Sequence, residues 1–550
     1  MTPFERFKKL ISLDKRDISQ IFLYAIFAGI ISLSLPLGIQ SIINFIQAGQ
    51  VSTSWIVLVF IVIVGVALGG TMKIMQFRIT ENLQQKIFVR ASFEFAYRFP
   101  RIKTSEFRDE YPPELANRFF DTLSIQKGVS KLLLDISTAL LQILFGIVLL
   151  SLYHSFFIFF GILLTVLLYL IYQMNFKAGL ATSLKESKYK YKVAHWLQEI
   201  ARNHISFKNQ NLFLFSLEKN DKLVNEYLEQ RESHFKILRK QFIQLVAFKI
   251  LLTAGLLIIG GLLVLNQQMN IGQFVAAEIV ILSIVTAVEK LFSGLELFYD
   301  VLTSLEKLGT VVDKEVETLV IEKGLYKLER KSPISIETKD LALTYKGSDT
   351  SALSHINIKI ESKDRILIKG DNGAGKSTLI RLLARLIEPT SGTIYLNNVN
   401  YKKYSLEEFR AIIGVITLNE TPFEGTILEN ITGNNPTITM EQIANVLERV
   451  KLTEVIKNLP NGLDTQLFPE GKQINSSVTQ KIVLARCIIQ QPKILFLEEP
   501  VDKTDDKSAK EIIDYLTSNE HDWTLIVISK DLYWEQKCNK TFTIDNGHLV

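Results

Sequence analysis

Two long stretches without acidic or basic residues dominate the first half of the chain. Residues 18–72 and 136–176 contain no Asp, Glu, Lys or Arg. A bilayer core requires about 20 apolar residues per helix, so each stretch has room for two membrane spans. Polar positions inside the stretches place the turns near residues 47–54 and 153–155. Buried helices of a soluble core are a poor alternative, because apolar runs of this length exceed ordinary soluble helices.

A third apolar pair follows and contains ionisable groups. Its first run, its turn and its second run are residues 242–265, 266–270 and 271–288. At a rise of about 1.5 Å per residue, Lys249 and Glu289 lie at a similar distance from the outer turn, so we expect them to pair. Glu278 lies closer to that turn. It either lines a substrate path or faces the interior of a helix bundle.

The distribution of basic residues predicts the orientation in the membrane. The long segments 73–131 and 177–240 are rich in Lys and Arg, whereas the short turns are uncharged. An excess of Lys and Arg marks the cytoplasmic side. We therefore predict six spans over residues 18–304 in the cell inner (cytoplasmic) membrane, with both termini in the cytoplasm and the helices continuing beyond the bilayer. Residues 1–17 mix Lys and Arg with Phe, Leu and Ile, which predicts an amphipathic segment on the membrane surface.

The second half begins with a charged linker, predicted over residues 305–332, and continues as an α/β domain over residues 333–550. A short strand at 365–369, a glycine-rich loop and a helical stretch at 379–387 follow one another in this domain. This order is typical of a P-loop, in which backbone N–H groups point at the phosphates of a nucleotide. The candidate nucleotide-binding residues of the loop are Gly370, Asp371, Asn372, Gly373, Ala374, Gly375, Lys376, Ser377 and Thr378.

Five residues in this half carry candidate chemistry. Lys376 is expected to contact the β and γ phosphates, and the Ser377 hydroxyl to bind Mg²⁺. Tyr345 is either a ring that stacks on adenine or an ordinary strand tyrosine. An apolar strand at 494–497 ends in two carboxylates, which predicts that Glu498 supports Mg²⁺ and that the catalytic residue Glu499 polarises the attacking water.

Composition supports a membrane protein and excludes other classes. The mean hydropathy is +0.19 and only 22% of the residues are charged, which is too apolar for an ordinary soluble enzyme of 550 residues. A net charge of +5 and seven scattered His suggest neither nucleic-acid binding nor a metal cluster. Cys487 and Cys538 both fall in the α/β half, where free thiols are expected in a reduced cytoplasm.

Together these features resemble a half-size ABC exporter: a six-helix α transmembrane domain joined to an α/β P-loop nucleotide-binding domain. The resemblance rests on the spans, Tyr345, the P-loop, the run QKIVLAR at 480–486 and the run ILFLEEP at 494–500, in this order. The membrane half is most similar to bacterial type I secretion and peptide-export permeases. The resemblance implies that two such chains dimerise and hold ATP between the P-loop of one and the signature motif of the other. Cytoplasmic tips near residues 112–122 and 204–215 would act as coupling helices.

Four positions depart from the family pattern. The LSGGQ signature position holds residues 474–478, Ile-Asn-Ser-Ser-Val, so both of its glycines are missing. Leu418 occupies the Q-loop glutamine position and Lys530 the switch-histidine position. Glu498 replaces the Walker B aspartate, although Glu499 is kept. Leu418 can neither bind Mg²⁺ nor orient water, and Lys530 cannot accept a hydrogen bond as histidine can.

These departures leave two functions open. The chain is either an ATP-driven exporter subunit, paired with itself or with a different half-transporter, or an ATP-binding membrane component that hydrolyses little. Retention of Lys376, Ser377 and Glu499 favours the first, and the substitutions favour the second. The expected partners are a second ABC chain, membrane lipid and, if the cargo is a peptide or protein, a periplasmic adaptor. The transported substrate is not indicated by the sequence.

Overall fold

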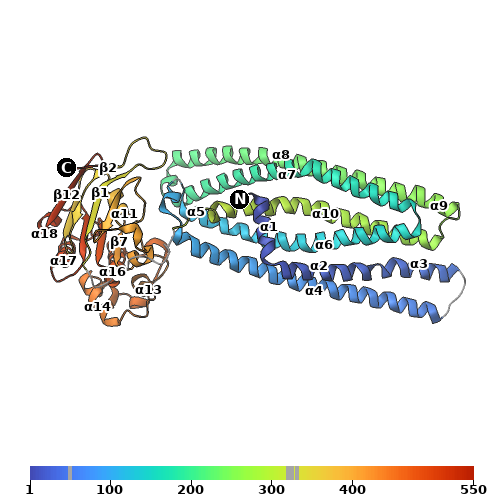
Figure 1. The fold of residues 1–550 in the computed structure, drawn as a ribbon, viewed down its shortest axis with the longest axis horizontal. Coiled ribbons are helices and arrows are strands. Elements are labelled where there is room, and N and C mark those ends of the chain that lie inside the picture. The colour runs from blue at the N-terminus through green and yellow to red at the C-terminus, as the bar shows by residue number, and fades with distance from the viewer. Residues whose placement is uncertain (48–52, 109, 318–327, 329–332) are drawn as a thin grey trace. The chain divides into compact units, whose positions relative to one another are not determined.

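The computed structural model divides the chain into two compact units, each of which is described by itself (Figure 1). Contacts group Met1–Ile102 with Asp109–Glu315, and Lys103–Arg108 with Val316–Val550. The structure describes residues 1–47, 53–108, 110–317, 328 and 333–550.

Long helices build the first unit and lie side by side along their length (Figure 1). They are α1 (Pro3–Leu13), α2 (Lys15–Ser32), α3 (Ser34–Gln47), α4 (Thr53–Arg98), α5 (Pro112–Ala116), α6 (Asp121–Tyr153), α7 (Phe156–Arg202), α8 (Gln210–Gly255), α9 (Gly261–Leu265) and α10 (Ile271–Val312). A π-helical turn at Leu256–Gly260 joins α8 to α9. The first span consists of two helices, α2 and α3, and Pro36 lies in the first turn of α3. A proline in a first turn costs little stability, because the N–H that it lacks would have no partner within the helix.

Six helical stretches in the described residues are long and apolar enough to cross a membrane, which confirms the six predicted spans. They are Lys15–Gln47, Thr53–Arg101, Pro112–Tyr153, Phe156–Arg202, Gln210–Leu265 and Ile271–Val312. The 47 residues of α7 extend roughly 70 Å, more than twice the thickness of a bilayer core. The predicted extension of the helices beyond the bilayer therefore agrees with their length.

The turns agree with the charge-free pattern where the structure describes them. Helix α6 ends at Tyr153 and α7 begins at Phe156, as predicted. Before α10, the Asn270 side chain accepts a hydrogen bond from the Gln273 N–H, and the Gln273 side chain accepts one from the Asn270 N–H. This capping box fixes the start of α10 after the predicted turn. Most of the first predicted turn, residues 48–52, lies outside the described residues.

Helix α10 is packed closely by α6 and α7 because small residues face it. A Cβ added to Gly128 would lie 2.3 Å from Val301, and one added to Gly179 would lie 2.4 Å from the Tyr299 ring. Glycine at these positions lets the helix backbones approach. Tyr299 is fully buried there, and its hydroxyl accepts a hydrogen bond from Gln241 on α8 at 3.1 Å.

The predicted pair between Lys249 on α8 and Glu289 on α10 is confirmed as a salt bridge. We expect Lys249→Met to destabilise the membrane unit by about 1–3 kcal/mol, because Glu289 is left as an unpaired carboxylate in an apolar span. The exchange Lys249→Glu with Glu289→Lys should recover most of that loss. Thermal unfolding in detergent measures both effects. Equal unfolding temperatures for the single and exchanged variants would contradict a stabilising pair.

Helix α10 continues to Val312, so the predicted linker at 305–332 starts too early. Leu305 and Val311 are buried, although charged residues lie between them. The charges between them are partnered within the helix bundle: Glu306 pairs with Arg6 of α1, and the Lys307 ammonium lies 5.1 Å from the centre of the Tyr191 ring of α7. The sequence pattern of these charges indicates the end of the span, whereas the structure shows that the helix continues through them. Residues 318–327 and 329–332 of the predicted linker lie outside the described residues.

The N-terminal segment forms α1, which packs on α10. The rings of Phe7 and Phe298 meet edge to face with centroids 5.0 Å apart. Arg6 also pairs with Asp313, just after α10, at 2.6 Å. The aromatic contact and the ion pairs hold α1 against the helix bundle. Its placement on the membrane surface stays a prediction.

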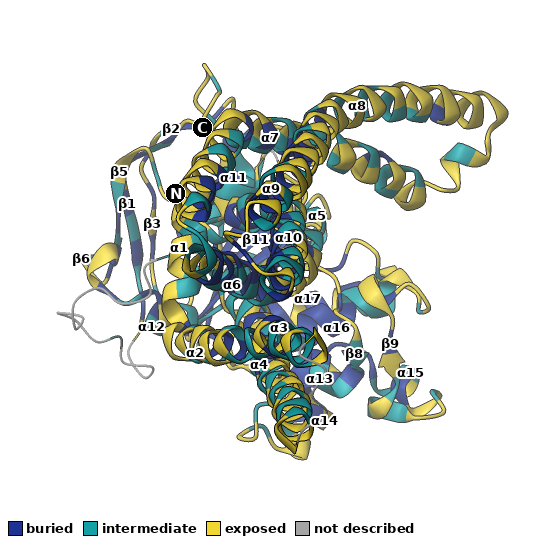
Figure 2. Cartoon of the chain, turned by 90° about the vertical axis from the view of Figure 1, so that its right-hand side faces the viewer, coloured by how far each residue is buried: buried dark blue, intermediate teal, exposed yellow. Residues whose placement is uncertain are grey.

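The two predicted coupling segments contain short helical turns. Residues 112–122 include α5 and a 3₁₀ turn at Asn117–Phe120, followed by the start of α6. Residues 204–215 include a 3₁₀ turn at Ser206–Lys208 and the start of α8. The residues at the start of α8 are mostly exposed, and Figure 2 draws this helix largely in yellow. The role of both segments in coupling stays a prediction.

Two sheets form the framework of the second unit. The six-stranded sheet has the order β13-β12-β4-β11-β10-β7, parallel except for β13, and the smaller antiparallel sheet has the order β2-β1-β5-β6 with β3 beside β1. The strands are β1 (Ile336–Leu343), β2 (Leu353–Ile356), β3 (Lys359–Ile360), β4 (Arg365–Lys369), β5 (Ser391–Leu396), β6 (Val399–Asn400), β7 (Ile413–Ile416), β8 (Gly425–Thr426), β9 (Gln466–Leu467), β10 (Ile494–Glu498), β11 (Thr524–Ile528), β12 (Lys540–Asp545) and β13 (His548–Leu549).

Helices cover the parallel sheet and bury its central strands. They are α11 (Lys376–Leu383), α12 (Leu406–Arg410), α13 (Ile427–Thr432), α14 (Met440–Arg449), α15 (Thr453–Lys457), α16 (Ser476–Ile489), α17 (Asp506–Thr517) and α18 (Tyr533–Lys537). Strands β10 and β11 are buried along their whole length, which explains their continuous apolar sequence. The carboxyl ends of β4, β10 and β11 meet at one edge of the sheet, where ligands bind in folds of this class.

Candidate nucleotide-binding site

The loop between β4 and α11 has the curled backbone that the P-loop interpretation requires. Gly370 and Gly375 have φ angles of +141° and +108°. A Cβ at Gly370 would lie 2.1 Å from the Ile544 carbonyl oxygen, and one at Gly375 would lie 2.6 Å from the Ala352 carbonyl oxygen. These two glycines are therefore required by the protein's own backbone. Gly373, with φ of +86°, has open space around it on the pocket side.

The side chains of Lys376 and Ser377 converge on this loop. The Lys376 ammonium donates hydrogen bonds to the carbonyl oxygens of Gly370 and Asp371, both at 2.7 Å. Ser377 donates a hydrogen bond to Glu498 at the end of β10. The first turn of α11 also presents free N–H groups, which favour an anion. The predicted phosphate-binding residue and the predicted metal-binding residues thus lie together.

The environment of Glu499 shifts the pKa of its carboxyl group. Its φ angle is +46°, a left-handed conformation that is costly for a residue with a side chain. The Glu499 N–H donates to the Ile528 carbonyl at 2.9 Å, and its carboxylate accepts a hydrogen bond from Ser529 at 3.1 Å. Burial raises the pKa of Glu499 above its ordinary value of 4.5, and the Ser529 hydrogen bond offsets part of that rise. The carboxyl therefore has more basic character than an exposed glutamate.

Tyr345 lies at the same pocket, and its hydroxyl shares a hydrogen bond with the Thr378 hydroxyl at 3.1 Å. Arg108, which belongs to the same compact unit, lies 4.8 Å from the centre of the Tyr345 ring. The ring is thus held beside the P-loop helix, in agreement with a base-stacking position. Stacking on adenine itself stays a prediction.

One cavity of about 620 Å³ collects most of the predicted site residues. Its walls include Tyr345, Asn372, Gly373, Gly375, Lys376, Ser377, Thr378, Glu498 and Glu499. Gly370, Asp371 and Ala374 are not among the wall residues. They shape the loop instead, and the Ala374 carbonyl accepts a hydrogen bond from the Gly547 N–H at 3.0 Å.

Two of the substituted family positions also lie in this cavity. Leu418 lines it with 54% of its surface exposed, and the Leu418 N–H donates to Glu498 at 3.3 Å. Lys530 lines it beside Glu499. An apolar side chain and an ammonium group thus occupy places at which the family pattern has glutamine and histidine.

The altered signature segment forms the start of α16. The Asn475 side chain caps this helix by accepting a hydrogen bond from the Ser477 N–H at 3.0 Å. Its amide nitrogen is left to donate to another group. The positive end of this 14-residue helix lies at the signature segment, where it favours a negatively charged ligand.

Sequence reasoning missed three polar residues of the site. Gln480 donates hydrogen bonds to the Glu499 carbonyl at 2.7 Å and to the Asp502 carboxylate. Asp502 and Ser529 line the cavity. Gln480 is the first residue of the QKIVLAR run, which carries the family resemblance but indicates no contact with Glu499. The position of Ser529 directly after a buried strand was the available signal for that residue.

Comparisons with known proteins agree with this geometry. The chain matches the sequence family "ABC transporter transmembrane region" over residues 18–288 and the family "ABC transporter" over residues 353–502. It is 30% identical to an ATP-dependent lipid A-core flippase of Idiomarina loihiensis over 44% of this chain and 41% of the relative. It is also 30% identical to a putative multidrug export ATP-binding/permease protein of Staphylococcus aureus over 39% of this chain and 37% of the relative.

A solved structure supports the fold over almost the whole chain. A bacterial Atm1-family ABC exporter with ATP bound superimposes with a TM-score of 0.83 at 16% identity, covering 98% of this chain and 94% of that one. The sequence alignments, in contrast, span less than half the length of the two curated relatives. The chain belongs to the ABC transporters. Its fold is that of an ABC exporter, the 550 residues of the chain contain one ABC transporter transmembrane region and one ABC domain, and the ABC domain implies ATP binding.

The raised pKa of Glu499 predicts the pH dependence of turnover. A carboxylate that activates water must be ionised, so turnover should be lost as the pH falls through this raised pKa, above pH 4.5. We expect Ser529→Ala to move the acid limb to higher pH, because the variant loses a hydrogen bond that lowers the pKa. A pH profile of ATP turnover measures the shift. An unchanged acid limb would show that Glu499 does not control it.

Proposed function

We propose that this chain is the ATP-binding half of a dimeric exporter that couples ATP binding and hydrolysis to the outward transport of a substrate. The observation that carries the proposal is the cavity at the end of β4 and β10, where Lys376, Ser377, Glu498 and Glu499 converge. Lys376 would exchange its two carbonyl partners for phosphate oxygens. Glu499 would accept a proton from the attacking water.

The oxygen donors in the cavity fit Mg²⁺. Ser377 and Glu498 already share a hydrogen bond, so the neutral Ser377 hydroxyl and the Glu498 carboxylate lie together and would hold the ion. Two protein ligands suit Mg²⁺, which keeps water and phosphate oxygens in its remaining positions. When bound, the ion neutralises charge on the β and γ phosphates. Glu498 is 5% exposed, and its second oxygen is held by the Leu418 N–H, so its carboxylate is already oriented.

A second chain would complete the site. The signature segment at the start of α16 offers helix N–H groups and the Asn475 amide to the nucleotide of a partner. Apolar side chains along α4, including Ile56, Phe60 and Phe77, are exposed in the isolated chain. They require lipid or another chain to cover them. The partner is either a second copy or a different half-transporter with an intact signature.

ATP turnover by the purified full chain in lipid vesicles tests the proposal. Binding of ATP with Mg²⁺ and measurable turnover are expected. Failure to bind ATP would overturn the proposal altogether. Binding without turnover would support the second candidate, an ATP-binding component that hydrolyses little, which the positions of Leu418 and Lys530 in the cavity favour.

Restoring the family residues separates the two candidates. We expect Leu418→Gln with Lys530→His to raise turnover roughly 10-fold or more, because the glutamine can orient water and the histidine can accept a hydrogen bond near the γ-phosphate. Phe423→Gln, at another exposed apolar position nearby in the chain, is the matched control. No gain over the wild type would mean that the substituted residues do not limit turnover.

The relatives bear on the cargo. The resemblance to peptide-export permeases suggested a peptide or protein, but the two relatives compared are described by lipid A and multidrug export. We therefore favour an amphipathic molecule over a peptide. Copurification of a periplasmic adaptor from native membranes would reverse that preference. The inner-membrane location and the cytoplasmic termini belong to the same proposal and rest on the distribution of Lys and Arg.

A further inference from the structure

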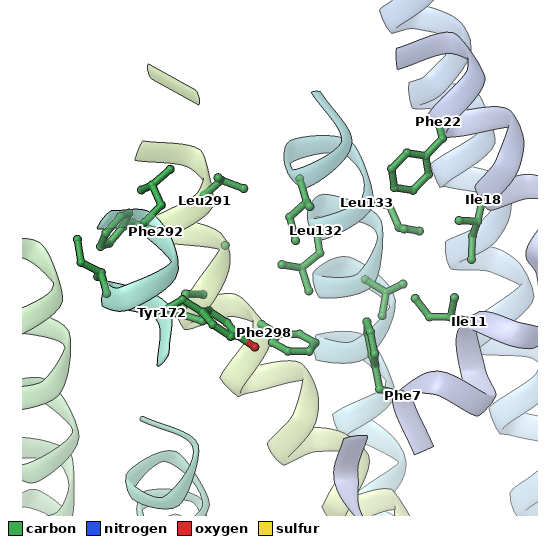
Figure 3. Close-up of a pocket in the computed structure, with 16 residues that line it drawn as sticks. Phe7, Ile11, Ile18, Phe22, Leu132, Leu133, Tyr172, Leu291, Phe292 and Phe298 are labelled. Carbon is green, nitrogen blue, oxygen red and sulfur yellow. The ribbon is translucent and has the colours of Figure 1, made fainter. Parts of the chain in front are cut away.

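An apolar cavity of about 490 Å³ lies in the membrane unit, and none of its wall residues belongs to the nucleotide-binding cavity (Figure 3). Five helices contribute to its walls: α1, α2, α6, α7 and α10. Figure 3 shows Phe7 and Ile11 on one side of the space, with Leu133 and Phe298 among the other wall residues. The Tyr172 hydroxyl is the only side-chain polar group among the sixteen wall residues.

The depth of this cavity follows from the charge pattern. Ile18 and Ile136 are the first residues of two charge-free runs, and Tyr172 lies close to the end of the second run. In the predicted orientation these positions mark the cytoplasmic edge of the bilayer core. The cavity therefore lies at the level of the first acyl carbons of the cytoplasmic leaflet.

The size and polarity of the cavity suit a hydrocarbon chain. Binding sites for small molecules commonly have volumes of roughly 300–1,000 Å³. Water would find almost no hydrogen-bonding partners on these walls. A charged or strongly polar ligand would lose its hydration without replacement. An aliphatic chain gives up no hydrogen bonds to water when it enters the cavity, and it gains close contacts with the apolar walls.

The charges beside the cavity favour an anionic head group. Four exposed basic residues lie on α1 and at the start of α2, namely Lys8, Lys9, Lys15 and Arg16. Three acidic residues lie on or between the same helices, and each is engaged: Glu5 accepts a hydrogen bond from the Thr2 N–H at the start of α1. Asp14 pairs with Arg90 and Asp17 pairs with Lys86, and both partners lie on α4. The ion pairs of Arg6 hold α1 in place as one wall.

We propose that this cavity binds an acyl chain of an anionic phospholipid from the cytoplasmic leaflet, with the head group beside the basic residues of α1 and α2. The bound lipid fastens α1 to the helix bundle and fills the space between α1, α6 and α10. The proposal does not depend on ATP turnover or on the identity of the cargo, so its test is separate from that of the proposed function.

Photolabelling of the full chain in nanodiscs tests the proposal. The probes are phosphatidylglycerol and phosphatidylcholine that carry the same photoreactive acyl chain, and labelled peptides are identified by mass spectrometry. We expect phosphatidylglycerol to label peptides of α1, α6 and α10 around the cavity. Replacing the four basic residues by Gln should reduce labelling by phosphatidylglycerol to the level of phosphatidylcholine. Equal labelling by the two lipids in the wild type would overturn the anionic preference.

A substitution at Gly294 can fill the cavity with a protein side chain. A Cβ at Gly294 would make only ordinary contacts, the nearest at 3.6 Å from Leu132, so Gly294→Leu directs its side chain into the space. We expect it to lower labelling roughly 10-fold, because the acyl chain loses two or more buried methylenes. Gly70→Leu on α4 is the matched control, since a Cβ there meets nothing within 4 Å.

A variant of a residue in another wall keeps the test valid if Gly294→Leu does not fold. Ile11→Trp fills the cavity from α1, which does not form the core of the bundle. Thermal unfolding and ATP binding show which variants are folded. Unchanged labelling of the cavity peptides in a folded Gly294→Leu or Ile11→Trp variant would overturn the proposal. Loss of labelling in both, with Gly70→Leu unaffected, would support it.

Discussion

Glu499→Gln is expected to lower ATP turnover by roughly 10²–10⁴-fold while ATP binding is kept, the range typical of losing a general base. Glutamine keeps the size of the side chain and can still bond to Ser529, but it cannot accept a proton from water. The full chain in lipid vesicles is the sample. Turnover and ATP binding are measured on the same preparation.

Two controls make this result specific. Glu441→Gln changes an exposed glutamate on α14 and should leave turnover unchanged. Contaminating ATPases would persist in Glu499→Gln, so equal rates in the variant and the wild type would mean that the measured activity belongs to another protein. A Glu499→Gln variant that also loses ATP binding would instead indicate that Glu499 supports the site structurally, through its strained left-handed backbone.

The spans and the P-loop could be predicted because one local physical demand dictates each of them. A bilayer excludes charge over about 20 residues, so residues 136–176 alone reveal two helices and a turn. The loop from Gly370 to Ser377 must curl around phosphate, and few sequences satisfy that geometry. The pair of Lys249 and Glu289 was predictable for a similar reason, since helical rise fixes depth along two antiparallel spans.

Features that depend on distant packing could not be predicted. The end of α10 was placed too early, because the sequence does not show that Leu305 and Val311 are covered by other helices. The hydrogen bonds from Gln480 to Glu499 and Asp502 join residues that are about 20 positions apart. The cavity beside α1 requires five helices to meet, and its wall residues resemble any other apolar positions of a span.

The substitutions in the cavity leave the P-loop residues unchanged. Lys376 and Ser377 keep hydrogen bonds within the loop and to Glu498. Leu418 and Lys530 line the same cavity. Phosphate binding depends on the P-loop residues, and the positioning of water depends on the two substituted positions. The geometry therefore predicts that ATP binding is less impaired than ATP hydrolysis. The Leu418→Gln and Lys530→His experiment tests this prediction, because it measures how much turnover the two substitutions recover.

Gly370→Ala is expected to destabilise the nucleotide-binding domain by roughly 3 kcal/mol or more. Two costs contribute to this value: the strain of a left-handed backbone at a residue with a side chain, and the overpacking caused by the added methyl group. The added methyl group would lie 2.1 Å from the Ile544 carbonyl oxygen, a backbone atom of β12 that cannot move without breaking the edge of the sheet. For a domain of this size the unfolding temperature should fall by roughly 6–12 °C. Thermal unfolding of the full chain without nucleotide measures the change.

Gly373→Ala is the matched comparison within the same loop. Its φ of +86° is also left-handed, but a Cβ there meets nothing within 4 Å. We expect a loss of only about 1–2 kcal/mol from backbone strain, and weaker ATP binding because the methyl group faces the cavity. If Gly373→Ala destabilises the domain as much as Gly370→Ala, strain and not the contact with Ile544 dominates. A stable Gly370→Ala variant would show that β12 can shift away from the loop.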